Sequence, residues 1–79
     1  MSRALRVVWH WPALAAFYRL PLHTATMVDR AVIRYAETGE GHLERVPPHH
    51  RLRAGFYDVV LNIDYDNQTI TVLWIYRAR

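Results

Sequence analysis

Residues 56–65 read Phe-Tyr-Asp-Val-Val-Leu-Asn-Ile-Asp-Tyr, and this stretch decides the fold. The odd positions hold Tyr57, Val59, Leu61, Ile63 and Tyr65. The even positions hold Phe56, Asp58, Val60, Asn62 and Asp64. Side chains of a strand point alternately to its two faces, so this period of two predicts a strand with one face in a core.

A second strand is predicted to return along the first. Residues 65–68, Tyr-Asp-Asn-Gln, have the composition of a turn, and residues 69–76 follow as a strand. One face of the return strand would carry Ile70, Val72, Trp74 and Tyr76. The other would carry Thr69, Thr71, Leu73, Ile75 and then Arg77. We expect the sheet face that holds Asp58, Asn62, Thr69, Thr71 and Arg77 to lie near solvent.

Working back to the N-terminus, residues 3–9 also alternate. Leu5, Val7 and Trp9 fall on one face, which predicts a first strand. Pro12 stands where a helix accepts proline in its first turn, so a short helix is predicted over residues 12–20. Its apolar stripe is Ala13, Phe17 and Leu20, and Pro21 breaks it.

A second helix is predicted over residues 22–37, ended by Gly39. Its buried positions recur at helical spacing and are Val28, Ala31, Val32 and Tyr35. Residues 39–48 are polar and hold two Gly and two Pro, which predicts a loop. Residues 51–55 are predicted to form a short strand that bends at Gly55.

The predicted order is therefore strand, helix, helix and then three strands, in a single domain over residues 1–79. This is an α+β fold in which a helical hairpin covers one face of a small antiparallel sheet. The uncovered face mixes polar and basic groups, so it is a candidate working surface.

Composition limits the possible functions. A chain of 79 residues buries a modest core, so a stabilising partner is expected. It has no cysteine, which excludes disulfides and thiolate metal sites and fits the cytoplasm. We find no apolar run long enough to cross a membrane and no signal peptide.

The charge is basic, with a net value of +3 and a pI of about 9.8. All ten basic residues are Arg, whose planar fork binds phosphate or carboxylate in a bidentate way. The chemistry suits nucleic acid or an acidic protein partner. A compositional bias toward Arg is the alternative.

The densest basic cluster spans residues 45–53, Arg-Val-Pro-Pro-His-His-Arg-Leu-Arg. Arg51 and Arg53 are two apart on a predicted strand, so both point to one face. Two guanidinium groups there suit a phosphodiester, and they would stabilise the charge that develops when a 2′-hydroxyl attacks phosphorus. A nearby His would move a proton. The alternative is a charged edge strand that prevents aggregation.

Other candidates are weaker. His49 and His50 are adjacent and point to opposite faces, so we expect no metal site. The three Trp residues are predicted to belong to the core rather than to stack on bases. Arg77 and Arg79 form either a phosphate clamp or a solubilising terminus.

Three segments together resemble the RelE/ParE toxins of type II toxin–antitoxin systems. Residues 50–60, His-Arg-Leu-Arg-Ala-Gly-Phe-Tyr-Asp-Val-Val, are similar to the signature strand pair of that family, with basic residues before a Gly and a Tyr. Residues 69–77 resemble its last strand, which ends in a basic residue. Residues 7–21 resemble its first strand and helical hairpin. The resemblance covers nearly the whole chain and implies the RelE-like fold.

The resemblance also implies a function and a site. RelE-like members enter the ribosomal A site and cleave mRNA, as endoribonucleases without a cofactor. ParE-like members inhibit DNA gyrase without being enzymes. By position, the implied catalytic residues are Arg51, Arg53, Arg77 and His50. The basic cluster and the C-terminus add Arg45, His49 and Arg79 as candidate RNA-binding residues, and His49 is the alternative to His50 for the proton transfer.

Asp58 departs from the family pattern, because the family has an Arg after the signature Tyr. A carboxylate there repels phosphate. The sequence given also lacks the tail that carries a catalytic Tyr in some RNases. Three functions therefore stay open, in this order: a ribosome-dependent mRNA interferase, a ParE-like gyrase inhibitor, and a decayed toxin that acts only in antitoxin binding and operon autoregulation. All three imply an antitoxin partner whose acidic side chains neutralise the arginines.

Overall fold

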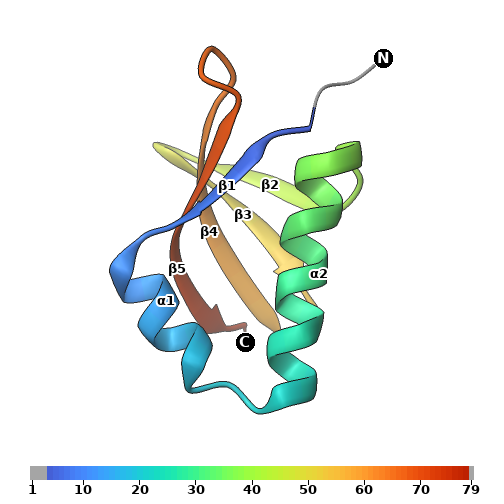
Figure 1. Ribbon diagram of the computed structural model, residues 1–79, viewed down its shortest axis with the longest axis vertical. Coiled ribbons are helices and arrows are strands. Elements are labelled where there is room, and N and C mark those ends of the chain that lie inside the picture. Colours follow the sequence, from blue (N-terminus) through green and yellow to red (C-terminus); the bar gives the residue numbers. More distant parts are fainter. Residues whose placement is uncertain (1–3, 79) are drawn as a thin grey trace.

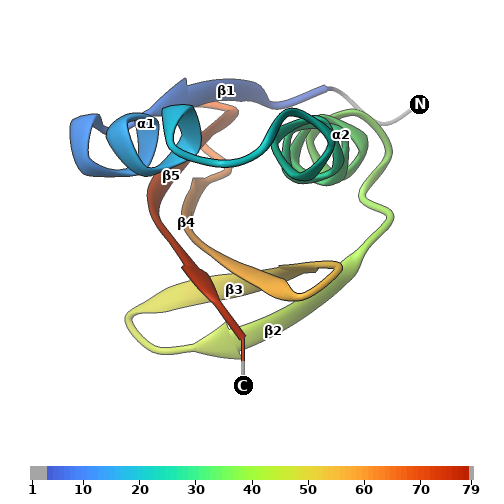
Figure 2. The same ribbon diagram turned by 90° about the horizontal axis from the view of Figure 1, so that it is seen from below.

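The computed structural model describes residues 4–78 and has two helices and five strands (Figure 1). In chain order these are β1 (Arg6–Trp9), α1 (Trp11–Tyr18), α2 (Leu22–Thr38), β2 (His42–Val46), β3 (His49–Ala54), β4 (Tyr57–Asp64) and β5 (Thr69–Arg77). The strands form one sheet in the order β1-β5-β4-β3-β2. In the view of Figure 2 both helices lie above β2 and β3. The predicted α+β class and the helical hairpin on a sheet are confirmed.

The sheet differs from the prediction in two respects. It is mixed, because β1 runs parallel to β5 while the other pairs are antiparallel. A chain that leaves a sheet through helices can return as a parallel strand, which a tight hairpin does not permit. The sheet also has a fifth strand, β2, inside residues 39–48, which were predicted to be a loop.

β2 was missed because only one of its side chains is even partly buried. Leu43 is half-buried, and the other positions of the strand are exposed. The strand pairs with β3 over its whole length. An edge strand needs little apolar content when its backbone is paired on one side, so its polar composition concealed it.

The helices begin and end close to the predicted bounds. Pro12 lies in the first turn of α1, as expected. The last turn of α1 tightens as the N–H of Arg19 bonds the Ala16 carbonyl, so the helix ends two residues before Leu20. Helix α2 ends at Gly39, which adopts φ 76° and donates its N–H to the Tyr35 carbonyl at 2.9 Å. Glycine takes this left-handed conformation without strain.

The core lies between the helices and the sheet. Its buried residues include the predicted positions of α2 and the odd positions of β4. They are Ala13, Val28, Val32, Ala36, Leu52, Ala54, Val59, Leu61, Ile70, Val72 and Ile75. Trp9 joins them from β1 and packs on Phe17, with 4.9 Å between ring centroids.

A bulge in β5 changes which of its side chains face the core. Val60 pairs with Trp74 but its neighbour Leu61 pairs with Val72, so β5 carries one extra residue, Leu73, at this point. The alternation therefore reverses beyond Val72. The sequence prediction that Trp74 and Tyr76 continue the core face is wrong. Ile75 is buried instead, and both aromatic residues are exposed.

Candidate functional site

We use the term open face for the side of β2, β3, β4 and the second half of β5 that is turned away from the core. Side chains directly opposite each other in an antiparallel sheet share a face and lie close together. Glu44 is opposite Arg51, Arg53 is opposite Asp58, and Asp58 is opposite Tyr76. We call these five residues the open-face cluster.

Arg51 is held from two sides in the cluster. It forms an ion pair with Glu44 and donates a hydrogen bond to the Tyr76 hydroxyl at 3.4 Å. The pKa of Arg51 is raised above its ordinary value, first by the Tyr76 hydroxyl and then by the Glu44 carboxylate. Arg51 therefore stays fully charged. Glu44 is more than half exposed, so water can solvate its carboxylate when Arg51 releases it.

Arg53 has a different partner and a different role. Its Nε donates to Asp58 Oδ1 at 2.8 Å. The Asp58 side chain is 6% exposed, whereas Arg53 is 48% exposed, so the expectation that Asp58 lies near solvent is wrong. A buried carboxylate without a partner is costly, so Asp58 depends on Arg53 more than Arg53 depends on Asp58. This pair contributes to the stability of the fold.

The charges of the open-face cluster cancel, because two arginines meet two carboxylates. A cavity of about 50 Å³ lies among them and is also lined by His42. An anion reaching this point has to displace a carboxylate from an arginine. The exchange is easier at Arg51 than at Arg53, since the partner of Arg51 is exposed.

The sheet separates the residues that the sequence grouped together. Arg51, Arg53 and His49 share the open face, because they occupy alternate positions of β3. Arg45 is opposite His50, and both fall on the other face. Arg77 is opposite Tyr57, also off the open face, and Arg79 lies outside the described residues.

The strand pairing also shows which histidine lies on the open face beside Arg51. The sequence favoured His50, which is opposite Leu61 and alternates with Arg51. His49 lies on the same face as Arg51. Its Nδ1 atom is buried and has no hydrogen-bond partner in the part of the chain that the structure describes. Buried polar atoms are usually paired, so this unpaired nitrogen sets His49 apart among the side chains of the described residues.

Two members of the cluster were not singled out from the sequence. Tyr76 was assigned to the core face because the bulge is invisible in the alternation. Glu44 was assigned to a loop, although Leu43 between His42 and Glu44 was a weak signal of a strand.

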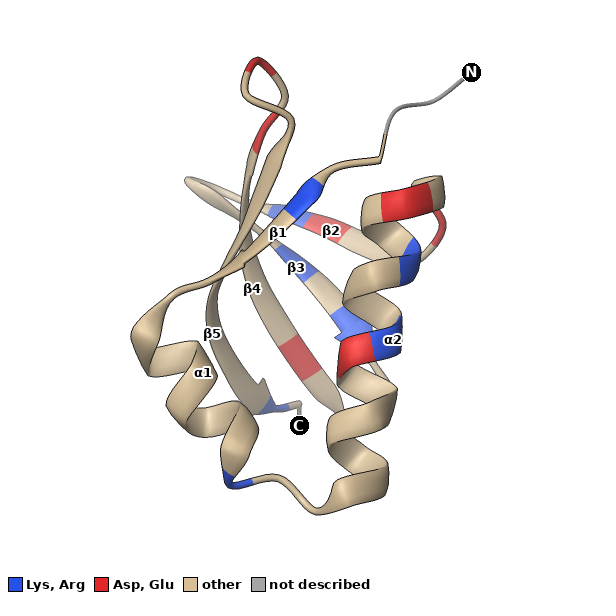
Figure 3. Ribbon diagram, in the orientation of Figure 1, with Lys and Arg blue, Asp and Glu red and all other residues tan. Residues whose placement is uncertain are grey.

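A second polar region is a groove of about 640 Å³ between α2 and β3. We call it the α2 groove. It is lined by His23, Thr26, Met27, Arg30, Ala31, Arg34, Glu40, Gly41, Leu52 and Arg53. Its basic residues come from α2 and β3, whose blue segments lie near each other in Figure 3.

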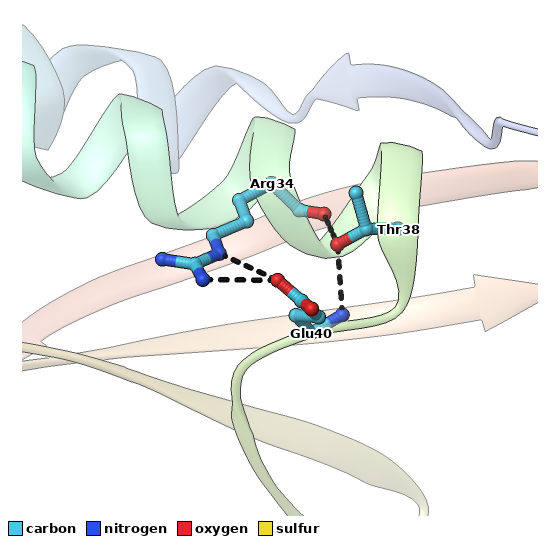
Figure 4. Close-up of polar contacts among 3 residues, drawn as sticks. All are labelled: Arg34, Thr38 and Glu40. Atoms are coloured by element: carbon cyan, nitrogen blue, oxygen red, sulfur yellow. Dashed lines mark hydrogen bonds and ion pairs between the residues drawn. The ribbon is translucent and has the colours of Figure 1, made fainter.

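Arg34 is fixed at the wall of the α2 groove (Figure 4). Its Nη2 and Nε atoms donate to Glu40 Oε1 at 2.9 and 3.1 Å. The Thr38 hydroxyl donates to the Arg34 carbonyl at 2.7 Å and accepts from the Glu40 N–H at 3.1 Å. These contacts secure the turn after α2. Both charged side chains are well exposed, so their ion pair adds little stability.

Residues 4–78 contain no group of three or more His, Asp or Glu side chains that would hold a metal ion. Over the same residues, neither helix is long and apolar enough to cross a membrane.

Solved structures with this architecture include RelE proteins. One match is the RelBE2 toxin–antitoxin complex of Mycobacterium tuberculosis, with a TM-score of 0.79 and 18% identity, covering 98% of this chain and 94% of that chain. Another is the archaeal RelE–RelB complex of Pyrococcus horikoshii, with a TM-score of 0.77 and 15% identity, covering 95% and 96%. A third is the isolated RelE toxin of E. coli, with a TM-score of 0.76 and 16% identity, covering 96% and 86%.

No protein-family profile matches this chain. A comparison with curated proteins finds no match either. The solved structures define the class of protein by its fold, which is an α+β fold with a helical hairpin on a mixed sheet. The particular fold is that of the RelE toxins, and the resemblance found in the sequence agrees with it.

Proposed function

We propose that this chain is the toxin of a type II toxin–antitoxin system, and that it stops translation in the cytoplasm by cleaving ribosome-bound mRNA. The observation that carries the proposal is the match to RelE toxins over nearly the full length of both chains. The arginines of the open face supply the chemistry, since no cofactor is required for phosphodiester cleavage by charge stabilisation.

Arg51 is the residue best suited to the reacting phosphate. In the proposed step the ribose 2′-oxygen attacks phosphorus and the bond to the 5′-oxygen breaks. This gives a 2′,3′-cyclic phosphate and a 5′-hydroxyl. Negative charge builds on the phosphate oxygens in the transition state, and a fixed guanidinium stabilises it. Arg51 exchanges its exposed partner Glu44 for the phosphate, while the Tyr76 hydroxyl keeps its guanidinium in place.

His49 is the proposed proton carrier, because it lies two residues from Arg51 on β3 and so on the same open face. The reaction needs one proton removed from the 2′-hydroxyl and one delivered to the 5′-oxygen. Arg53 is assigned a supporting role, since its main partner is the buried carboxylate of Asp58.

The α2 groove is the proposed binding site of an antitoxin. Arg30, Arg34 and His23 line it together with the apolar side chains of Met27 and Leu52. An amphipathic segment with acidic residues complements this mixture. Several of the matched RelE structures are complexes with RelB proteins, which supports a partner of the same kind here. Co-purification with the product of the adjacent gene tests this, and failure to bind would exclude that product as the antitoxin.

A decayed toxin is the second candidate, and one observation favours it: the arginines of the open-face cluster are already neutralised by Glu44 and Asp58. A gyrase inhibitor has less support, because the matched structures described above are RelE proteins.

Induction of the chain in a bacterial host separates these functions. The proposal predicts growth arrest with a rapid fall in amino-acid incorporation, and loss of both effects in the Arg51→Ala variant. Arg6→Ala is the matched control, since Arg6 is exposed on β1 at the far edge of the sheet. Folded wild-type protein that leaves growth unchanged would support the decayed toxin. Arrest with normal translation and reduced supercoiling would support the gyrase inhibitor.

A further inference from the structure

A groove of about 440 Å³ lies between α1 and the second half of β5. We call it the aromatic groove. Its lining consists of Trp11, Pro12, Ala15, Ala16, Arg19 and Trp74. The pairing of β1 with β5 ends at Val72, so no strand of the described chain covers β5 on this side beyond that residue. Helix α1 packs there instead, as Figure 1 shows.

The two tryptophans of this groove are not core residues. Trp11 is 73% exposed and Trp74 is 49% exposed, whereas Trp9 packs against Phe17 beside the core. The sequence prediction that all three belong to the core is therefore wrong for two of them. Trp74 faces outward because of the bulge at Leu73. Large aromatic side chains left exposed around a hollow mark a binding surface.

The charge of the groove selects its ligand. Arg19 is the one charged residue of the lining, and no acidic side chain lines it. Arg19 also has no ion-pair partner among residues 4–78. Exposed tryptophans beside an unpaired arginine are the combination that binds single-stranded nucleic acid, with bases stacked on the rings and phosphate at the cation.

One residue of the groove, Trp74, is in register with Arg51 of the open-face cluster. Val60 on β4 pairs with Arg51 on β3 and with Trp74 on β5. The three residues therefore form one row across the three strands. Neighbouring strands are about 4.8 Å apart, which puts Arg51 and Trp74 about 10 Å apart across the sheet. A strand of RNA with a phosphate at Arg51 has its neighbouring bases within reach of the aromatic groove.

We propose that the aromatic groove binds an unpaired base of single-stranded RNA, stacked on Trp11 and Trp74, with Arg19 at an adjacent phosphate. This inference rests on the proposed function, in which the same strand is cleaved at Arg51. The groove holds the base next to the reacting phosphate and so fixes the position of the strand on the open face.

Binding of a fluorescently labelled single-stranded RNA 12-mer to the purified chain, without ribosomes, tests this. Trp11→Ala and Trp74→Ala are each expected to weaken binding by about tenfold, since base stacking on an aromatic ring contributes roughly that factor. Phe56→Ala is the matched control, because Phe56 is 74% exposed and lies outside the groove, and its affinity should equal that of the wild type.

Two further probes identify the contacts. A double-stranded RNA of the same sequence has no free bases, so its affinity should be equal for the wild type and both Trp variants. Arg19→Gln should lower the slope of log K against log salt by about 0.7, the value for one phosphate contact on a single strand.

Equal affinity of wild type, Trp11→Ala and Trp74→Ala for the single strand would overturn the inference. A loss in Phe56→Ala as large as that in the Trp variants would do so as well. If the Trp variants lose affinity for an antitoxin but not for RNA, the groove is a protein-binding surface and the inference is wrong. If mRNA is cleaved but the Trp variants bind normally, the inference alone fails. If RNA binding depends on the tryptophans but no mRNA is cleaved, the proposed function alone fails.

Discussion

The open-face cluster and the aromatic groove are connected through Trp74, which is in register with Arg51 across β4, yet they offer a ligand very different chemistry. The cluster contains two arginines that are each paired with a carboxylate, so its charge is zero before any ligand arrives. The groove contains a single arginine that has no acidic partner in the described chain, beside two exposed tryptophans. The number of arginines is therefore a poor guide to anion binding, because their partners decide which charges are available.

The largest expected effect is on stability, and it distinguishes a tryptophan of the core from a tryptophan of the aromatic groove. Trp9→Ala should lower the free energy of unfolding by about 3 kcal/mol, because it removes a large side chain packed against the core. Trp11→Ala should change it by less than about 0.5 kcal/mol, because Trp11 is exposed. Urea denaturation measures both. A loss in Trp11→Ala as large as in Trp9→Ala would mean that the groove is part of the core.

The next effect distinguishes the two arginines of the cluster. Arg53→Ala should cost about 2 kcal/mol of stability, since it leaves the buried Asp58 carboxylate unpaired. Arg51→Ala should cost clearly less, because its carboxylate partner Glu44 is exposed to water. Urea denaturation of the two variants gives the comparison.

A control for this prediction removes both partners. The double variant Arg53→Ala/Asp58→Ala should recover part of the stability lost in Arg53→Ala, because no buried charge is then stranded. Equal stability of Arg51→Ala and Arg53→Ala would contradict the assignment of Arg53 to the fold.

A smaller effect tests whether neutralisation limits the cluster. Asp58→Asn keeps the shape of the side chain and removes its charge, which leaves Arg53 free to attract phosphate. Affinity for single-stranded RNA at low salt should rise by about fivefold, corresponding to about 1 kcal/mol for one additional charge. Fluorescence anisotropy measures it, with Asn62→Ala as a control on the same strand. Unchanged affinity would show that Asp58 does not restrain RNA binding.

The smallest expected effect lies at the β4–β5 turn, away from both regions. The pKa of Asp64 is lowered, first by the Asn67 side-chain amide and then by the Asn67 backbone N–H. The resulting stability is present above the ordinary pKa of 3.8 and is lost as pH falls through the lowered value. Asn67→Ala should raise the pKa of Asp64 toward 3.8, as NMR titration would detect, and should leave RNA binding unchanged. A changed RNA affinity would connect this turn to the site.

Much of the fold could be predicted from the sequence, because it follows from side-chain periodicity. The alternation in β4 and the helical spacing in α2 correctly identified Val59, Leu61, Val28 and Val32 as core residues. Pro12 and Gly39 correctly marked the start of α1 and the end of α2. These signals are local, so they can be interpreted without knowledge of the tertiary structure.

The candidate site was harder to predict, because it depends on pairing between strands. The bulge at Leu73 inserts one residue and so turns Trp74 and Tyr76 to the open face. The sequence of residues 69–76 carries no signal that predicts this bulge. The pairing of Glu44 with Arg51 required β2 to be recognised as a strand. Arg51 and Arg53 were correctly placed on one face, but their carboxylate partners could be found only in the assembled sheet.

Above all, we propose that Arg51 on the open face acts in the cleavage of ribosome-bound mRNA. The most direct measurement adds the purified chain to a cell-free translation system and maps mRNA ends by primer extension. We expect new 5′ ends at codons in the ribosomal A site with the wild type and with Arg6→Ala, and no such ends with Arg51→Ala. Intact mRNA with the wild type, or the same new ends with Arg51→Ala, would contradict it.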